Sequence, residues 1–258
     1  MKNFLPLVSS LVFALLLPIA AAQTVPPPSP PPPPAATPVD ASAPVAKKDS
    51  GRFLQKHESF LQRAKEGPIG LLFLGDSITE GWTKAPEIWK AYYEKYQPAN
   101  FGIGGDQTQH VIWRIENGEL DGLHPRVVVL MLGTNNSAAH TGEQIAAADT
   151  KIVQLIRSKL PETKVLLLAI FPRGPRKNKD GVVTDDGIKR MAAINAANTE
   201  LAKLDDGKNV RFLDITAKFL DADGRIPDAI MPDQLHPNAA GYKIWAEATQ
   251  PLLDEMMR

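Results

Sequence analysis

Three nearly uniform apolar runs limit the folds available to this chain. They lie at residues 69–74, 127–132 and 165–170, and each is too apolar for a strand with one face in water. Segments with helical spacing of apolar residues separate them, as in residues 145–156. This alternation is typical of parallel strands joined by crossover helices. We therefore predict an α/β domain, a three-layer α/β/α sandwich around a central parallel sheet of about five strands.

Weaker signals complete the predicted sheet and its helices. Val210–Leu213 is predicted to be a shorter strand, and a further short strand is expected before Asn100-Phe101. The last helix is predicted over Ala239–Met256. A less regular helical stripe that we expect to face the core consists of Ile188, Met191, Ile194 and Leu201.

The first 22 residues have the composition of a secretory signal. A short basic start and a long apolar stretch precede the small residues Ala20-Ala21-Ala22, which suit a signal peptidase. An uncleaved membrane anchor is the alternative, although the apolar stretch is shorter than the ~20 residues that a spanning helix needs. Both interpretations predict export, to the periplasm or the medium. After cleavage we expect no membrane span.

Residues 23–50 are predicted to be a Pro-rich disordered linker. The prolines between residues 25 and 38 remove the backbone donors that helices and sheets need, and they favour an extended polyproline II conformation. A spacer through a cell envelope and a tolerated disordered tail are equally good interpretations. The folded domain is then expected to span residues 51–258.

Charge and cysteine content exclude several functional classes. Lysine plus arginine equal aspartate plus glutamate at 29 each, so no net positive field exists to hold nucleic acid. The chain has no cysteine, which excludes disulfides, thiolate metal sites and a lipidated N-terminal cysteine. The histidines lack the paired spacing of metal ligands. We expect neither a metal nor a cofactor.

A candidate nucleophile follows the first apolar run at Gly75-Asp76-Ser77. A buried strand turns into a helix there, at the edge of the sheet where α/β proteins place their sites. A serine hydroxyl needs a base at neutral pH. Asp233 precedes His236 by three residues and can fix the imidazole tautomer that removes the serine proton. The alternatives are a helix N-cap at Ser77 and a loop histidine without chemistry at His236.

Donors at two other strand ends predict an oxyanion hole. The candidates are the backbone amides of Ser77 and Gly105 and the side-chain amide of Asn135. The alternatives are an ordinary flexible turn at Gly104-Gly105 and, for Asn135 and Asn136, a cap on the following helix or hydrogen bonds that satisfy loop amides. A nucleotide-binding loop is disfavoured because no phosphate-binding lysine follows the glycines. Together with the serine, these groups indicate acyl transfer.

Four short blocks resemble the conserved blocks of the SGNH, or GDSL-type, ester hydrolases in the same order. The blocks are Gly75–Thr79, Asn100–Gly105, Gly133–Asn136 and Asp233–His236. From about residue 51 onward the chain is most similar to the catalytic subunits of intracellular platelet-activating-factor acetylhydrolase. The predicted signal and linker have no counterpart in those cytosolic enzymes, so the resemblance carries over the chemistry and not the cellular role.

The resemblance implies a flavodoxin-like SGNH fold and a role for each matched residue. It implies catalysis by Ser77, Asp233 and His236, and it selects Asn135 over Asn136 for the oxyanion hole. Three further residues are candidates for substrate contact, namely Asp76, Gly104 and Arg173. For Asp76 the resemblance favours support of neighbouring loops, and for Arg173 a solvated loop charge is the alternative. Because the resembled subunits pair, a homodimer is also expected.

We predict an exported serine esterase that cleaves short acyl esters, above all acetyl esters, through an acyl-enzyme. No inserted segment is long enough for an apolar lid, and a shallow cleft offers little surface to a long acyl chain. The substrate is expected to be a small-molecule or polysaccharide ester, or a phospholipid-like ester. Two alternatives stay open, a lipase or thioesterase of the same superfamily and a non-catalytic carbohydrate-binding protein on this fold.

Overall fold

A parallel sheet of five strands lies at the centre of the computed structural model, which describes Met1 and residues 40–49 and 51–258. The strands are β1 (Leu71–Gly75), β2 (Pro98–Gly102), β3 (Val127–Met131), β4 (Lys164–Leu168) and β7 (Val210–Leu213). Their order is β2-β1-β3-β4-β7, and every neighbouring pair is parallel. The predicted α/β class and five-stranded sheet are confirmed.

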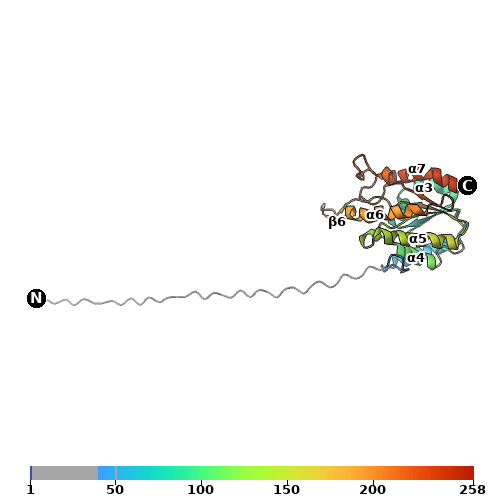
Figure 1. The fold of residues 1–258 in the computed structure, drawn as a ribbon, viewed down its shortest axis with the longest axis horizontal. Coiled ribbons are helices and arrows are strands. Elements are labelled where there is room, and N and C mark those ends of the chain that lie inside the picture. Colours follow the sequence, from blue (N-terminus) through green and yellow to red (C-terminus); the bar gives the residue numbers. More distant parts are fainter. Residues whose placement is uncertain (2–39, 50) are drawn as a thin grey trace. The chain divides into compact units, whose positions relative to one another are not determined.

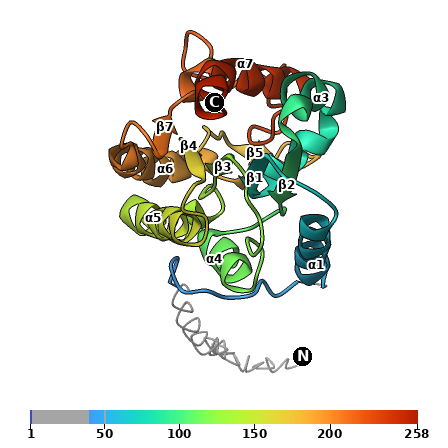
Figure 2. The same cartoon turned by 90° about the vertical axis from the view of Figure 1, so that its right-hand side faces the viewer.

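Helices cover both faces of this sheet (Figures 1 and 2). One face packs against α1 (Arg52–Lys65), α4 (Thr108–Glu116), α5 (Gly142–Lys159) and α6 (Gly187–Leu201). The other packs against α3 (Pro86–Tyr93) and α7 (Ala239–Met256). The remaining elements are short: α2 (Ser77–Glu80), β5 (Arg176–Lys177), β6 (Val183–Asp185), and the 3-10 turns η1 (Gly81–Lys84), η2 (Glu94–Tyr96), η3 (Asn136–Ala138), η4 (Ala202–Leu204) and η5 (Thr216–Phe219).

Alternation along each strand divides the apolar side chains between two cores. Leu72 and Leu74 of β1 face the α1, α4, α5 and α6 side, whereas Leu71 and Phe73 face α3 and α7. All four are buried, as expected for a parallel sheet with two covered faces. Burying each such side chain contributes about 1.5–3 kcal/mol.

The chain reverses its direction of travel across the sheet between β1 and β3. From β1 it moves outward to β2, and it then returns past β1 to β3, β4 and β7. The carboxyl ends of β1 and β3 therefore flank a topological switch point, where open α/β sheets bind their ligands.

The predicted stripe on α6 is wrong at its first position. Ile194 and Leu201 are buried, but Ile188 is 67% exposed. Its side chain lies at the rim of a hollow formed by the loops that follow β4 and β7. In the first turn of α6, Gly187 packs against the backbone of Gly174, so this turn covers the loop that follows β4.

The predicted linker boundary at residue 51 also needs correction. Residues 2–39, with the predicted signal and the proline-rich tract, lie outside the described residues, but residues 40–49 pack against the domain. Ala41 is buried, and its carbonyl accepts a hydrogen bond from Thr108 Oγ1 at 2.8 Å. The backbone N–H of Val45 donates to the carbonyl of Gln109 at 3.2 Å. Small residues allow this close approach to α4, which composition alone does not reveal.

Candidate active site

Ser77 lies where β1 ends at the switch point and is the first residue of α2. Gly75 permits this turn, because a Cβ atom there would approach the carbonyl oxygen of Met131 on β3 to 2.5 Å. The helix is capped by Asp76, whose Oδ1 accepts the backbone N–H of Ile78 at 2.9 Å. The cap proposed as the alternative role of Ser77 therefore belongs to its neighbour.

The structure joins Ser77, His236 and Asp233 in one chain of hydrogen bonds. Ser77 Oγ lies 2.9 Å from His236 Nε2, although 159 residues separate them in the sequence. His236 Nδ1 lies 2.7 Å from Asp233 Oδ2. With its proton on Nδ1, the imidazole donates to the carboxylate and leaves Nε2 to accept the serine proton.

The carboxylate of Asp233 is held by more than the imidazole. Its Oδ1 accepts the backbone N–H groups of His236 at 2.7 Å and Leu235 at 3.2 Å. Its Oδ2 also accepts Arg176 Nη2 at 3.0 Å. Burial by itself would raise the pKa of Asp233, but the hydrogen bonds from His236 and the charge of Arg176 hold that pKa well below its ordinary value. Asp233 is therefore ionised throughout the neutral range.

Gly105 occupies a tight turn beside the serine. The turn is closed by a hydrogen bond from Asp106 N to the carbonyl of Ile103 at 3.1 Å, and Gly105 has a φ of 75° at its third position. Only glycine adopts this backbone readily. A Cβ atom on Gly104 would lie 3.8 Å from Ser77 Cβ, so the turn borders the nucleophile.

Side chains hold this turn from two directions. Glu80 Oε2 accepts the backbone N–H of Gly104 at 2.8 Å. Lys47 donates to the Gly104 carbonyl at 2.5 Å and pairs with Asp106 at 3.7 Å. This lysine lies within the predicted linker, residues 23–50. An ordinary flexible turn would lack such restraints.

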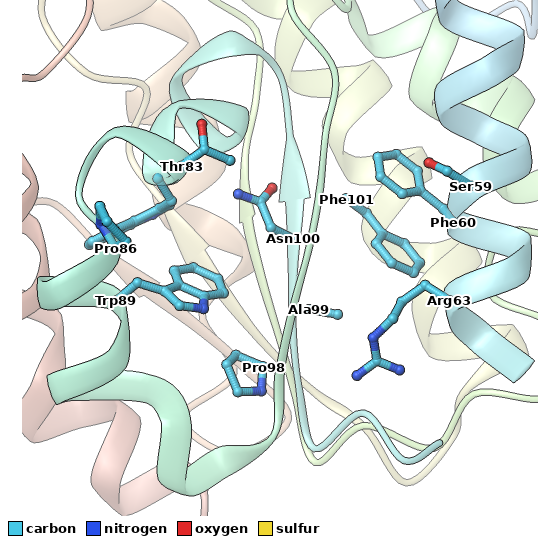
Figure 3. Close-up of a pocket in the computed structure, with 11 residues that line it drawn as sticks. Ser59, Phe60, Arg63, Thr83, Pro86, Trp89, Pro98, Ala99, Asn100 and Phe101 are labelled. Carbon is cyan, nitrogen blue, oxygen red and sulfur yellow. The ribbon is translucent and has the colours of Figure 1, made fainter. Parts of the chain in front are cut away.

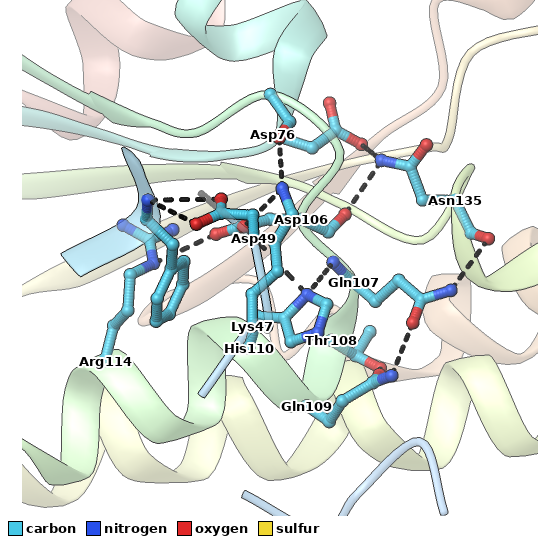
Figure 4. A network of polar contacts seen from close by, with 12 residues as sticks. Lys47, Asp49, Asp76, Asp106, Gln107, Thr108, Gln109, His110, Arg114 and Asn135 are labelled. Carbon is cyan, nitrogen blue, oxygen red and sulfur yellow. Dashed lines mark hydrogen bonds and ion pairs between the residues drawn. The ribbon is translucent and has the colours of Figure 1, made fainter. Parts of the chain in front are cut away.

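Asn135 connects the loops that follow β1 and β2. Its Nδ2 donates to the carbonyl of Asp106 at 2.8 Å and to Asp76 Oδ2 at 3.3 Å (Figure 4). The helix cap predicted as its alternative role is not observed, because its side chain forms no capping bond to η3. Asn136 is fully buried and bonds Thr108 through both its amide oxygen and its amide nitrogen. Asn135 is thus half-buried and bonds the loops beside Ser77, whereas Asn136 is fully buried and bonds Thr108.

Asp76 and Arg173 are both buried and bond neighbouring loops. Asp76 is fully buried, and this burial raises its pKa to about 6 against the opposing effects of the Ile78 N–H and the charges of His236 and Arg173. Arg173 is 3% exposed and donates to both oxygens of Thr134 at 3.1 Å, beside Asn135. The predicted alternative of a solvated loop charge at Arg173 is wrong.

A buried ion-pair network underlies the Gly105 turn and was not anticipated from the sequence. Arg114 is fully buried and lies 3.1 Å from Asp106 (Figure 4). It lies 2.8 Å from Glu119. It also donates to the carbonyl of Phe101 at 2.9 Å. Removing one partner from such a network costs about 3–5 kcal/mol. An arginine in an amphipathic helix gives no sequence signal that it is buried.

Two hollows among the described residues differ in their relation to the candidate site. One, of about 410 Å³, flanks the edge strand β2 between α1 and α3 and is lined by aromatic groups that include Phe60 and Trp89 (Figure 3). None of the candidate site residues lines it. The other, of about 550 Å³, is lined by Arg173, Gln234 and apolar side chains that include Ile188. Among the described residues no cluster of three or more metal-ligating side chains occurs.

Comparison with known proteins identifies the family. Residues 73–244 match the model of the GDSL-like lipase/acylhydrolase family. The chain belongs to this family. It is 35% identical over 223 residues to platelet-activating factor acetylhydrolase IB subunit alpha2 of Rattus norvegicus, an alignment that covers 84% of this chain and 90% of that protein. The identity to the alpha1 subunit of Homo sapiens is 35% over 218 residues, with 83% and 89% covered.

Solved structures share the fold of this GDSL-like acylhydrolase. A GDSL-like lipase from Bacteroides thetaiotaomicron superposes with a TM-score of 0.62 at 18% identity, covering 77% of this chain and 97% of that chain. A carbohydrate acetylesterase from Sinorhizobium meliloti gives 0.55 at 18%, covering 72% and 98%. Fold and family together confirm the predicted resemblance and the predicted class, an ester hydrolase. No helix within residues 40–49 and 51–258 has both the length and the apolar character to cross a membrane.

Proposed function

We propose that this chain hydrolyses short acyl esters, above all acetyl esters of carbohydrates or phospholipid-like alcohols, through an acyl-enzyme on Ser77. One observation carries the proposal, the continuous hydrogen-bond chain from Ser77 Oγ through His236 to Asp233 with distances of 2.9 and 2.7 Å. Each atom in it is placed for the proton transfer that a serine esterase needs.

The proposed reaction has two halves. Ser77 Oγ attacks the ester carbonyl carbon while His236 Nε2 takes the hydroxyl proton, and the resulting imidazolium returns this proton to the departing alkoxide oxygen. The C–O bond to the alcohol breaks and an acyl-serine remains. Water then attacks the acyl carbon while His236 Nε2 takes a proton from it. The bond between the acyl carbon and Ser77 Oγ breaks, and the imidazolium returns the proton to Ser77 Oγ as the acid leaves. Asp233 stabilises the imidazolium in both halves.

The proposed oxyanion hole uses the donors at the ends of β1, β2 and β3. Ser77 is the first residue of its helix, where backbone N–H groups lack helical acceptors, and Gly105 sits at the third position of a tight turn. Asn135 Nδ2 must exchange its longer bond, the 3.3 Å contact with Asp76, for the substrate oxygen. Donors that meet charge only after attack favour the transition state over the bound ester.

Short connections favour a small acyl group. Residues 103–107 join β2 to α4, and residues 132–141 join β3 to α5, so neither connection has enough chain to enclose a long acyl tail, whereas the connections after β4 (residues 169–186) and β7 (residues 214–238) are longer. The relatives named above are acetylhydrolases, and one structural neighbour is named a carbohydrate acetylesterase. These names support acetyl as the acyl part of the substrate. The alcohol part must be identified by experiment.

The decisive assay offers purified full-length protein a panel of acetylated substrates. Acetylated xylan, acetylated pectin, O-acetyl sialosides and an acetylated phospholipid would be compared by acetate release, with Ser77→Ala as the matched control. We expect one class to be hydrolysed well above the others and the variant to lose about 10⁴-fold or more in turnover. A variant that keeps a tenth of wild-type turnover on p-nitrophenyl acetate would overturn the assignment of Ser77.

Export to the periplasm or the medium is a further proposal, supported by the composition of residues 1–22. Expression of the full chain in a bacterial host, followed by fractionation and N-terminal sequencing, tests it. We expect a mature chain that begins near residue 23 in the exported fraction. Recovery of the intact N-terminus from the cytoplasm would refute export.

A homodimer also stays a proposal, supported by the relatives' description as subunits. Analytical ultracentrifugation of the purified chain would distinguish one copy of 28.1 kDa from two. A single species at the monomer mass across micromolar concentrations would refute pairing.

A further inference from the structure

We propose that Arg176 is a positioning residue for the reaction, because its guanidinium shares an oxygen of Asp233 with His236 and so fixes the carboxylate that orients the base. The proposal rests on the proposed roles of Ser77, Asp233 and His236. It concerns a residue that lies outside the four blocks matched in the sequence and that no sequence pattern singled out.

The hydrogen bonds at Asp233 carry the proposal. Its Oδ2 accepts His236 Nδ1 at 2.7 Å and Arg176 Nη2 at 3.0 Å. Its Oδ1 accepts two backbone N–H groups, those of Leu235 and His236. Each oxygen therefore has two donors, and the carboxylate cannot rotate without breaking several bonds. Among the residues that the structure describes, Arg176 provides the one side-chain donor besides the base itself.

The strand that carries Arg176 is itself anchored at the site. Arg176 lies opposite Asp185 in the antiparallel pair of β5 and β6. Asp185 forms ion pairs with Arg190, at 3.0 Å, and with Arg173. Arg173 in turn bonds Thr134, the residue before Asn135. The β5–β6 hairpin is thus tied to the loop that carries the proposed oxyanion donor, and Arg176 of this hairpin bonds Asp233.

Arg176 also sets the electrostatic balance around the imidazole. The groups that face His236 and Asp233 are Ser77 of α2, the carboxyl of Asp76 after β1, the neutral hydroxyl of Tyr242 on α7 and the guanidinium of Arg176 on β5. Asp76 and Asp233 bring negative charge to this site, and Arg176 brings positive charge. Removing Arg176 takes a cation away from the base, so the acid limb of kcat/KM should move to higher pH.

The test compares pH profiles of kcat/KM on p-nitrophenyl acetate for the wild type, Arg176→Gln, Arg176→Lys and Lys177→Gln. Lys177 is the matched control, since it is exposed, adjacent on β5 and of equal charge. For Arg176→Gln we expect the acid limb to move to higher pH by about 0.5 unit, as expected for one partly screened charge. We also expect kcat to fall about three- to tenfold with KM little changed, as expected for a less well-positioned base. Arg176→Lys should restore the limb, and Lys177→Gln should leave it in place.

Two further measurements keep each outcome decisive. Thermal unfolding reports whether a variant is folded, and ¹⁵N NMR titration of the imidazole of His236, assigned with a His236→Asn spectrum, reports the same shift without turnover. An acid limb and an imidazole titration that both stay unchanged in a folded Arg176→Gln variant would overturn the proposal. An acid limb that moves equally in Lys177→Gln would show a general effect of losing one positive charge. This result would also overturn the proposal. Wild-type activity retained in Ser77→Ala would instead refute the proposed function on which this inference rests.

Discussion

Asn135 Nδ2 lies 3.3 Å from Asp76 Oδ2, so the amide proposed to stabilise the oxyanion donates to a buried carboxylate. Its other hydrogen bond, to the Asp106 carbonyl at 2.8 Å, holds the amide in place. A substrate oxyanion would compete with this carboxylate for the hydrogen bond from Asn135 Nδ2. Asp76 and the oxyanion are alternative acceptors for the same N–H group.

Replacement of Asn135 by alanine should therefore lower kcat by about 10²–10³ with little change in KM, because the lost bond forms only after attack. Steady-state kinetics on p-nitrophenyl acetate measure both constants. Asn136→Ala is the contrasting variant, because that buried side chain bonds Thr108 and its loss should lower the melting temperature. A higher KM with unchanged kcat in Asn135→Ala would assign Asn135 to substrate binding only.

Asp76 should make stability depend on pH in a direction unusual for a carboxyl group. Its pKa rises from 3.8 to about 6 on folding, so between these values the folded chain binds more protons than the unfolded chain. Stability should then fall as pH rises from about 4 to 6, and Asp76→Asn should remove this loss. Urea unfolding should show the variant gaining about 1–3 kcal/mol relative to wild type between pH 4 and pH 7. A constant difference across that range would show that the folded pKa of Asp76 is ordinary.

Asp233→Asn should cost less activity than His236→Ala. The carboxylate orients the imidazole and stabilises its charged form, whereas the imidazole itself transfers the proton. The pH profile of kcat/KM should lose its acid limb in the histidine variant. Small and equal losses in both variants, with the limb retained, would point to another base.

Lys47→Gln should lower kcat by about 5- to 20-fold, since Lys47 bonds the Gly104 carbonyl and pairs with Asp106 in the turn that carries Gly105. The neighbouring Lys48 is exposed, so Lys48→Gln is the matched control for loss of one charge. Kinetics and thermal unfolding of both variants separate the two roles. An unchanged kcat accompanied by a lower melting temperature would limit Lys47 to holding residues 40–49 on the domain.

The value of kcat/KM should be highest for short acyl chains in a homologous series of esters. Each buried methylene contributes about 0.8 kcal/mol, so a matching groove would favour long chains progressively. We expect kcat/KM on p-nitrophenyl esters to peak between acetate and butyrate and to fall by octanoate, without activation by a lipid interface. Efficiency that rises through decanoate would favour the lipase or thioesterase alternative.

The sequence by itself determined the sheet and the residues that face its carboxyl edge. Uniform apolar runs predicted β1, β3 and β4, because strands of a parallel sheet are buried on both faces. This pattern can be recognised within each segment alone. Polar residues after the first two runs predicted Ser77 and Asn135, and the glycines after the weaker strand near Asn100 predicted Gly105, since every parallel strand ends at the same edge. His236 and Asp233 followed from their spacing and from the family resemblance.

Only the tertiary structure decided which charges surround those residues. Arg176 reaches Asp233 across 57 residues, Lys47 reaches Asp106 from a segment that composition placed in a linker, and Arg114 is buried although its residue type favours the surface. Long side chains with charged ends find partners through folding, and their contacts have no periodicity along the chain. The chemistry of the site is therefore local in the sequence, whereas its electrostatic setting is a property of the fold.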